Sequence, residues 1–218
     1  MSSEESNQEE EFTWEAYYEW IEGREPRPLF TEGLAKFGDT SGSEMQAIDL
    51  GCGDGTETLA LLEAGWNVLA IDGEPAAIRY FESKVPDELR PHLQTSIKSF
   101  EDLDLVETNL VYAGFSIPFC APEHFNRMWG NVTDHIRPGG RFVGQLFGVR
   151  DSWAEEREMT FHSLDQVESL LASDFEVEAL NEIDEDGEAF SGPKHWHTFD
   201  IIAMKLNPSV FKSGQSRS

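Results

Sequence analysis

The sequence predicts an α/β fold: a doubly wound, mostly parallel seven-stranded sheet that ends in a C-terminal antiparallel hairpin. Short apolar strands alternate with helical segments from residue 46 onward, which is the pattern of a parallel sheet covered by helices on both faces. The last two predicted strands have no helix between them, so they must pair antiparallel. A chain of 218 residues suits one domain with a single core.

The domain is assigned to residues 12–206, between two polar ends. Residues 1–11 hold five glutamates and no basic residue, which is typical of a disordered acidic tail. Residues 207–218 are expected to form a flexible tail. Residues 12–44 are expected to form an N-terminal helical cap that is broken by two prolines. Its first helix carries aromatic residues that could form a lid over a ligand or a buried helix face: Trp14, Tyr17, Tyr18 and Trp20.

Turn and capping residues mark the ends of the predicted helices. The helix after the first strand ends at Gly65, because glycine suits the left-handed position after a helix. Pro75 opens the next helix. A third helix over 122–136 ends at Arg137–Gly140, and Ser163 caps a fourth. The strands are expected over residues 47–50, 66–71, 93–97, 109–113, 141–147, 175–183 and 195–206, with a hairpin turn at Asp186–Gly187.

A glycine-rich turn, Asp49–Gly55, follows the first strand at the place where ligands bind in such sheets. Its glycines lack Cβ atoms and let a ligand approach the backbone closely. Dinucleotide binders space their glycines as G-x-G-x-x-G around a pyrophosphate, whereas this turn reads G-x-G-x-G. Asp49 and Asp54 would repel a pyrophosphate and favour the cationic end of a ligand. The alternative is a tight corner that binds nothing.

A second acidic residue, Asp72, ends the second predicted strand, about 20 residues after the glycines. A carboxylate at this position accepts hydrogen bonds from both hydroxyls of a ribose. The alternative role is to cap the helix that Pro75 opens. Glu74 is better placed to cap that helix, which leaves Asp72 for a ligand.

Four segments together resemble the class I S-adenosylmethionine-dependent methyltransferases, with the small-molecule, tellurite-resistance-like branch as the nearest match. They cover about residues 45–147 and occur in the order usual for that family. The resemblance implies a Rossmann-like fold with S-adenosylmethionine as cofactor. The segments are Ile48–Thr56, Ile71–Pro75, Val111–Phe115 and Ile136–Phe142.

The resemblance also assigns cofactor-binding residues in the glycine turn and after the next three strands. Asp49 would meet the amino acid part of the cofactor, and Asp72 would bind the ribose. Ser99 and Phe100 would border the adenine, although many relatives have an acid where Ser99 stands. Phe115 would lie near the sulfonium and the acceptor. The full set is Asp49, Gly51, Cys52, Gly53, Asp72, Gly73, Ser99, Phe100, Ala113 and Phe115.

The implied activity is in-line methyl transfer from S-adenosylmethionine to a small-molecule acceptor. Alignment of the reactants and exclusion of water can supply much of the rate, so no catalytic residue is assigned. Residues 115–120 could form a wall against the acceptor or simply pack in the core, and Trp153 could contact the acceptor. Two alternatives stay open: a catalytically silent S-adenosylmethionine-binding partner or sensor protein, and an NAD-dependent oxidoreductase, which the glycine spacing opposes.

His195 and His197 fall on one face of the last predicted strand. They could bind a metal, act as a general base, or simply pack and hydrogen bond within the strand. No third ligand has a clear spacing, so no metal site is predicted.

The net charge, hydropathy and cysteine content of the chain limit the classes of partner and the compartment that we expect for it. Its 42 acidic and 16 basic residues give a net charge of −26, which opposes binding to nucleic acid and to anionic membranes. No apolar run approaches the roughly 18–20 residues of a membrane span. Two cysteines make no disulfide framework and fit a reducing compartment. We therefore expect a cytoplasmic monomer or homodimer.

Overall fold

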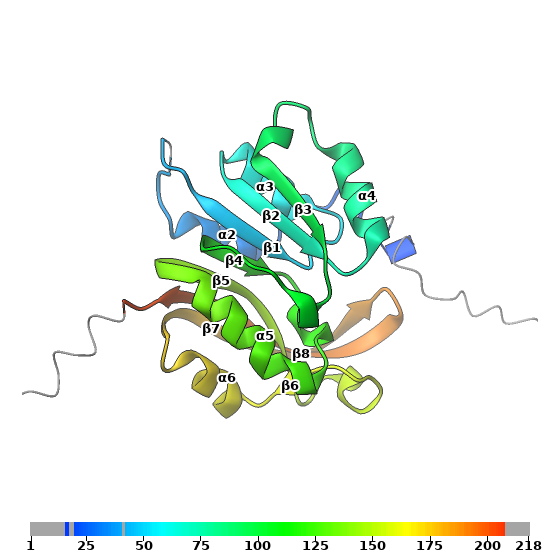
Figure 1. Ribbon diagram of the computed structural model, residues 1–218. Helices are drawn as coiled ribbons and strands as arrows, with labels where there is room; N and C mark the ends of the chain where they lie inside the picture. Colours follow the sequence, from blue (N-terminus) through cyan, green and yellow to red (C-terminus); the bar gives the residue numbers. More distant parts are fainter. Residues whose placement is uncertain (1–15, 18–19, 41, 208–218) are drawn as a thin grey trace, which may run out of the picture.

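The computed structural model describes residues 16–17, 20–40 and 42–207 (Figure 1). The predicted tail over residues 1–11 lies outside the described part, as does the second tail beyond residue 207. Trp14 and Tyr18 of the aromatic segment also lie outside it. The predictions for these residues stay predictions.

The described residues form a single sheet with the strand order β3-β2-β1-β4-β5-β8-β7. Strands β1 to β5 pair in parallel with their neighbours, whereas β8 runs antiparallel to both β5 and β7. The predicted Rossmann-like fold with a C-terminal hairpin is confirmed, and a two-residue strand, β6 (Phe161–His162), also pairs with β5. The other strands are β1 (Gln46–Leu50), β2 (Asn67–Asp72), β3 (Leu93–Ile97), β4 (Thr108–Ala113), β5 (Ile136–Gly148), β7 (Phe175–Ala189) and β8 (Gly192–Lys205).

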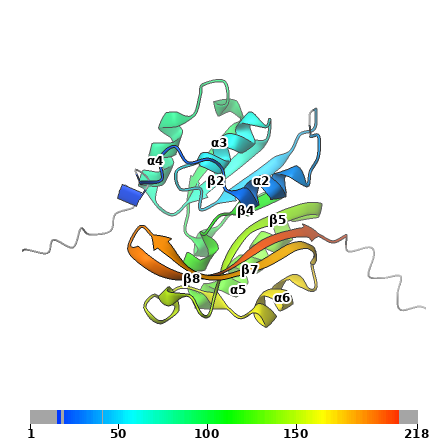
Figure 2. The same cartoon turned by 180° about the vertical axis from the view of Figure 1, so that it is seen from behind.

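Helices cover both faces of the sheet, as the alternation of strands and helices predicts (Figures 1 and 2). Successive residues of a strand point to opposite faces, so Ala47 and Ile48 belong to two different cores. On one face lie α2 (Pro28–Ala35), α3 (Thr56–Glu63) and α4 (Pro75–Lys84), and on the other lie α5 (Pro122–His135) and α6 (Leu164–Leu171).

Among the described residues, no helix is both long enough and apolar enough to cross a bilayer.

The expected helix ends are confirmed. Gly65 follows α3 with φ 84°, a left-handed conformation that glycine adopts without strain. The Glu74 side chain accepts a hydrogen bond from Ala76 N at 3.1 Å and so caps α4. Ser163 and Gln166 form a reciprocal capping box at the start of α6.

Two predicted turns are wrong, because both segments lie within strands, the first at a register shift in β5 and the second in the C-terminal hairpin. Strand β5 begins at Ile136 instead of residue 141, since Ile136 pairs with Thr108 before a register shift. The hairpin does not turn at Asp186–Gly187, because Asp186 pairs with His195 and the strands continue to the Ala189–Gly192 pair. A glycine within a strand can pack against a neighbour as well as turn the chain, and Gly187 lies against the Trp196 ring.

Candidate active site

One cavity of about 780 Å³ brings the predicted cofactor residues together. All of them line it except Ala113, which is fully buried in the core; the next residue, Gly114, lines the cavity. Parallel strands present their carboxyl ends at one edge of the sheet, so residues after β1, β2, β3 and β4 meet there. The volume falls within the range of about 300–1,000 Å³ that is usual for small-ligand sites.

The glycine turn is held close to two neighbouring segments. The N–H groups of Gly51 and Cys52 donate to Ile71 O, at 2.7 and 3.0 Å, which ties the turn to β2. The Ser116 hydroxyl donates to Leu50 O from the other side. Gly51 has φ 77°, and a Cβ atom there would overlap Ser116. The turn therefore needs glycine both for its backbone conformation and for the close approach of Ser116.

Asp49 is a buried acid at the cavity, 1% exposed. Thr58 Oγ1 donates to its Oδ2 at 2.5 Å, and it forms no ion pair with a described residue. Burial raises the pKa of Asp49 to about 8, the charge of Glu57 adds to the rise, and the Thr58 hydrogen bond opposes it. A cation placed beside Asp49 would favour its charged form.

Replacing Asp49 with asparagine is expected to make the ligand-free protein less sensitive to rising pH. The unfolded state loses the Asp49 proton near pH 4, about its ordinary pKa, whereas the folded state keeps it until about pH 8. The folded state binds more protons between these values, so this group lowers the free energy of unfolding as pH rises. Thermal unfolding between about pH 5 and pH 8 checks this. An equal fall in Tm in Asp49→Asn and in the unaltered protein would contradict it.

Asp72 lies at the edge of the cavity with both carboxylate oxygens engaged by backbone. Oδ2 accepts from Gly53 N at 2.9 Å and Oδ1 accepts from Glu74 N at 2.8 Å. Burial raises the pKa of Asp72, and these two hydrogen bonds oppose the rise. Asp72 is therefore less free than the sequence suggests. Each oxygen still has acceptor capacity for a ligand hydroxyl.

An ion cluster that the sequence does not predict joins the N-terminal segment to the glycine turn. The Arg24 guanidinium donates to both oxygens of Glu57, each at 2.6 Å, and to Asp54 Oδ1 at 2.8 Å. Burial disfavours the charge of Arg24, but Glu57 and Asp54 outweigh it and raise the Arg24 pKa. Asp54 is thus paired within the protein, and Asp49 remains as the acid that a cationic ligand would meet.

The hydroxyl of Tyr112 is a buried polar group without a hydrogen-bond partner among the described residues. Tyr112 precedes Ala113, the last residue of β4, and lines the cavity. Buried hydroxyls in folded proteins normally have partners. A ligand in the cavity would supply one.

Some of the residues expected to contact the acceptor line the cavity, and others are buried in the core. Phe115, Ser116 and Phe119 line the cavity, and so does Trp153. Ile117 and Cys120 are buried in the core on the other side of this segment.

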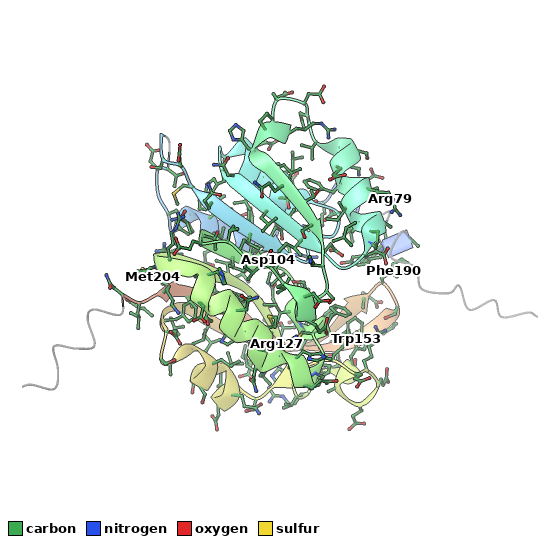
Figure 3. All side chains as sticks on the ribbon, viewed as in Figure 1. Arg79, Asp104, Arg127, Trp153, Phe190 and Met204 are labelled. Carbon is green, nitrogen blue, oxygen red and sulfur yellow. The ribbon has the colours of Figure 1, made fainter. Side chains whose placement is uncertain are left out.

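Three aromatic rings form an outer rim of the cavity. Tyr17 and Trp20 of the N-terminal segment pack on Phe190 at the hairpin tip, with centroid distances of 6.0 and 5.8 Å. All three line the cavity, and Trp20 is 58% exposed. Figure 3 labels Phe190 and Trp153, which lie on the same side of the molecule. Of the two expected roles of the aromatic segment, this packing fits the lid.

His195 and His197 do not line the cavity. The ring nitrogens of His195 contact Asp186 and Asp184 at 2.7 and 2.8 Å, and these acids raise its pKa. His197 is buried, with its ring between Arg150 N and Glu182. Both histidines pack and hydrogen bond within the hairpin. Within the described ranges, no cluster of histidines, cysteines and acids could hold a metal ion.

Several residues of the cavity carry no local sequence signal. Arg24 and Glu57 are more than 30 residues apart, and only the fold shows that they pair. Trp196 lies at the cavity because of the way β8 pairs with β7 in the hairpin. Tyr112 could have been suspected, because it lies within the fourth-strand segment of the family.

The cavity fits a molecule that joins a cationic amino acid to a nucleoside. A buried acid without a cationic partner lies at the glycine turn, and a second acid lies at the end of β2. The overlap of a Cβ at Gly51 shows how tightly the turn is built. The unpartnered Tyr112 hydroxyl provides one further contact.

Comparisons with known proteins agree with this picture. Residues 47–140 match a family described as a methyltransferase domain. A curated relative is carboxy-S-adenosyl-L-methionine synthase of Yersinia enterocolitica, 27% identical over 124 residues, which is 54% of this chain and 46% of the relative. The chain therefore spans about half the length of the curated relatives it matches.

Solved structures of low sequence identity share the fold. TehB from Haemophilus influenzae has a TM-score of 0.68 at 16% identity, over 88% of this chain and 67% of that one. The 1,6-didemethyltoxoflavin-N1-methyltransferase of Burkholderia thailandensis, solved with 1,6-didemethyltoxoflavin and S-adenosylhomocysteine, has a TM-score of 0.64 at 19% identity, over 88% and 83%. The matched residues contain the glycine turn and Asp72, and the whole sheet has the fold of these solved proteins.

Proposed function

We propose that the protein transfers a methyl group from S-adenosylmethionine to a small-molecule acceptor in the same cavity. The observation that carries this proposal is the convergence of the strand-end residues and an aromatic surface on one cavity of about 780 Å³. When bound, S-adenosylmethionine supplies a methyl carbon that is activated by a positively charged sulfur.

The residues of the chain would bind and align the two ligands. Asp72 would accept hydrogen bonds from the ribose hydroxyls, and Asp49 would face the cationic amino acid end. Phe115 has a left-handed backbone, φ 55°, and donates its N–H to Gln145 Oε1 at 3.2 Å, which fixes it beside the cavity. A strained residue held in this way is frequent at functional sites. Alignment and exclusion of water supply the rate, so this mechanism needs no dedicated base.

Two observations support a small acceptor. The cavity has room for a compact molecule beside a cofactor, and its aromatic residues suit an apolar or planar one. The acceptor named for the Burkholderia thailandensis relative, 1,6-didemethyltoxoflavin, is also a small molecule. The charge of −26 opposes nucleic acid as an acceptor.

Calorimetric titrations with S-adenosylmethionine and with NADH test the cofactor. We expect S-adenosylmethionine to bind and NADH not to bind, and the reverse result would contradict the proposal. Transfer of a labelled methyl group to thiols, amines, phenols and carboxylates then tests the activity. Tight cofactor binding without transfer to any of these compounds would favour a catalytically silent binding protein.

Replacing Asp72 with alanine is expected to raise the Kd for S-adenosylmethionine by about 5- to 150-fold, or about 1–3 kcal/mol, the scale of a lost hydrogen bond to a charged group. Asp104→Ala is the matched control, because Asp104 is exposed and does not line the cavity (Figure 3). Calorimetry on the two variants gives the result. An unchanged Kd in Asp72→Ala would remove Asp72 from the cofactor site.

A further inference from the structure

Five aromatic residues form a continuous surface in the cavity, here called the acceptor wall. Contacting rings have centroids 5.8 to 6.5 Å apart, which is the range of direct aromatic packing. They come from the segment after β4, the end of β5, the turn after β5 and strand β8. The wall consists of Phe115, Phe119, Phe147, Trp153 and Trp196.

A buried ion pair supports the wall from outside the cavity. Lys194 Nζ lies 4.0 Å from the ring centroid of Trp196 and 4.4 Å from that of Trp153. Lys194 pairs with Asp151, and both residues are buried. The charge of Lys194 is therefore compensated within the protein, and its contacts fix the two tryptophan rings.

Two arginines place positive charge on the wall. Arg27 Cζ lies 4.8 Å from the ring centroid of Phe115, and Arg157 Cζ lies 4.2 Å from that of Trp153. Both arginines line the cavity. Five arginines of the described chain form ion pairs with acids, whereas neither Arg27 nor Arg157 does. Because the chain has 42 acidic residues, two arginines in one cavity without an ion pair to any described residue indicate a binding role for their charge.

The acids of the cavity belong to other parts of it. Asp49, Asp54, Asp72 and Glu74 are at the cofactor motifs. Glu57 is paired with the Arg24 side chain and also accepts a hydrogen bond from Arg27 N at 3.1 Å. Glu101 follows β3, where a hydrogen bond with Ser99 lowers its pKa. Glu188 lies near the tip of the hairpin, opposite Pro193. Positive charge is thus associated with the acceptor wall, and negative charge with the cofactor motifs, the Arg24 cluster and the hairpin end.

We propose that the methyl acceptor is a flat aromatic molecule with an anionic group, either a carboxylate or an ionised hydroxyl. Its ring would pack on the acceptor wall, and its anion would bind the guanidinium of Arg27 or Arg157, which suits planar anions. This inference rests on the proposed function. The same arginines would keep an acidic acceptor ionised, so methyl transfer to its anionic oxygen would need no base. They would also repel acceptors that carry an ammonium group.

Binding of four small compounds tests the wall directly, without turnover. The compounds are 2-naphthoate, 2-naphthylmethanol, 2-naphthylmethylammonium and cyclohexanecarboxylate, titrated calorimetrically into the protein with and without saturating S-adenosylhomocysteine. We expect 2-naphthoate to bind about tenfold or more tighter than the ammonium compound, as one charge-assisted hydrogen bond would give. It should also bind more tightly than the alcohol and than cyclohexanecarboxylate, which lacks an aromatic ring.

Arginine variants test whether Arg27 and Arg157 cause the tighter binding of the anionic compound. The double variant Arg27→Gln/Arg157→Gln is expected to bind 2-naphthoate no more tightly than 2-naphthylmethanol. Arg79→Gln is the control, because Arg79 is an exposed residue of α4 that does not line the cavity (Figure 3). An unchanged Tm shows that the double variant is folded.

The outcomes separate this inference from the proposed function. Equal or tighter binding of the ammonium compound would overturn the inference, as would an anion preference that survives in the double variant. Equal binding of cyclohexanecarboxylate and 2-naphthoate would overturn its aromatic part. The proposed function fails on a different result, namely the absence of S-adenosylmethionine binding to the unaltered protein.

Discussion

Replacing Arg24 with leucine is expected to lower the free energy of unfolding by about 3–5 kcal/mol, the cost of breaking a buried ion pair by removing one partner. The change leaves Glu57 and Asp54 without their cation, and their side chains are only 4% and 6% exposed. A carboxylate in such surroundings must either remain charged at high cost or take up a proton. Urea unfolding at neutral pH measures the loss.

The double variant Arg24→Leu/Glu57→Leu gives a sharper test of the same cluster. It removes two of the three charges together, so we expect part of the stability to return. Arg79→Leu removes an exposed arginine and is expected to change stability by about 0.5 kcal/mol or less. If Arg24→Leu is no more harmful than this control, the cluster does not stabilise the fold.

Replacing Gly55 with alanine has the second largest expected effect, a loss of about 2–5 kcal/mol of stability. Gly55 has φ 76°, and a left-handed conformation costs alanine about 1–2 kcal/mol. The new Cβ would also overlap the ring of Phe81, which is 1% exposed and cannot move freely. Overpacking of this kind costs about 1–3 kcal/mol.

Gly65→Ala separates the two contributions. Gly65 has a similar φ of 84°, but a Cβ there would meet nothing within 4 Å. We therefore expect only the conformational cost of about 1–2 kcal/mol. Denaturant unfolding of the two variants is the measurement, and equal losses would show that the contact with Phe81 is unimportant.

Local sequence patterns were enough to predict which strand-end residues line the cavity together. Asp49 and Asp72 are strand-end residues, and the carboxyl ends of parallel strands meet at one edge of the sheet. The helix ends at Gly65, Glu74 and Ser163 were predictable for a similar reason, because capping depends on residues within one turn of the helix.

The acceptor side could not be predicted in this way, because it depends on contacts between distant segments. Arg24 marks the end of an N-terminal helix in the sequence, yet in the structure it binds Glu57 of α3. Trp196 enters the wall through the pairing of β8 with β5 and β7. The hairpin was predicted too short, since its outer pairs use charged residues such as Asp186 and His195 instead of apolar ones.

Under the proposed function, the rim formed by Tyr17, Trp20 and Phe190 would control how ligands enter and leave the cavity. These rings line the same cavity as the cofactor motifs and the acceptor wall, so a ligand that enters past them would reach both. Such an entrance would favour an order of events in which the more deeply held ligand enters first and leaves last. Departure of the spent cofactor would then limit the cycle, as gated product release does in many enzymes. Changes at Trp20 or Phe190 would alter the rate of the cycle without altering the methyl transfer itself.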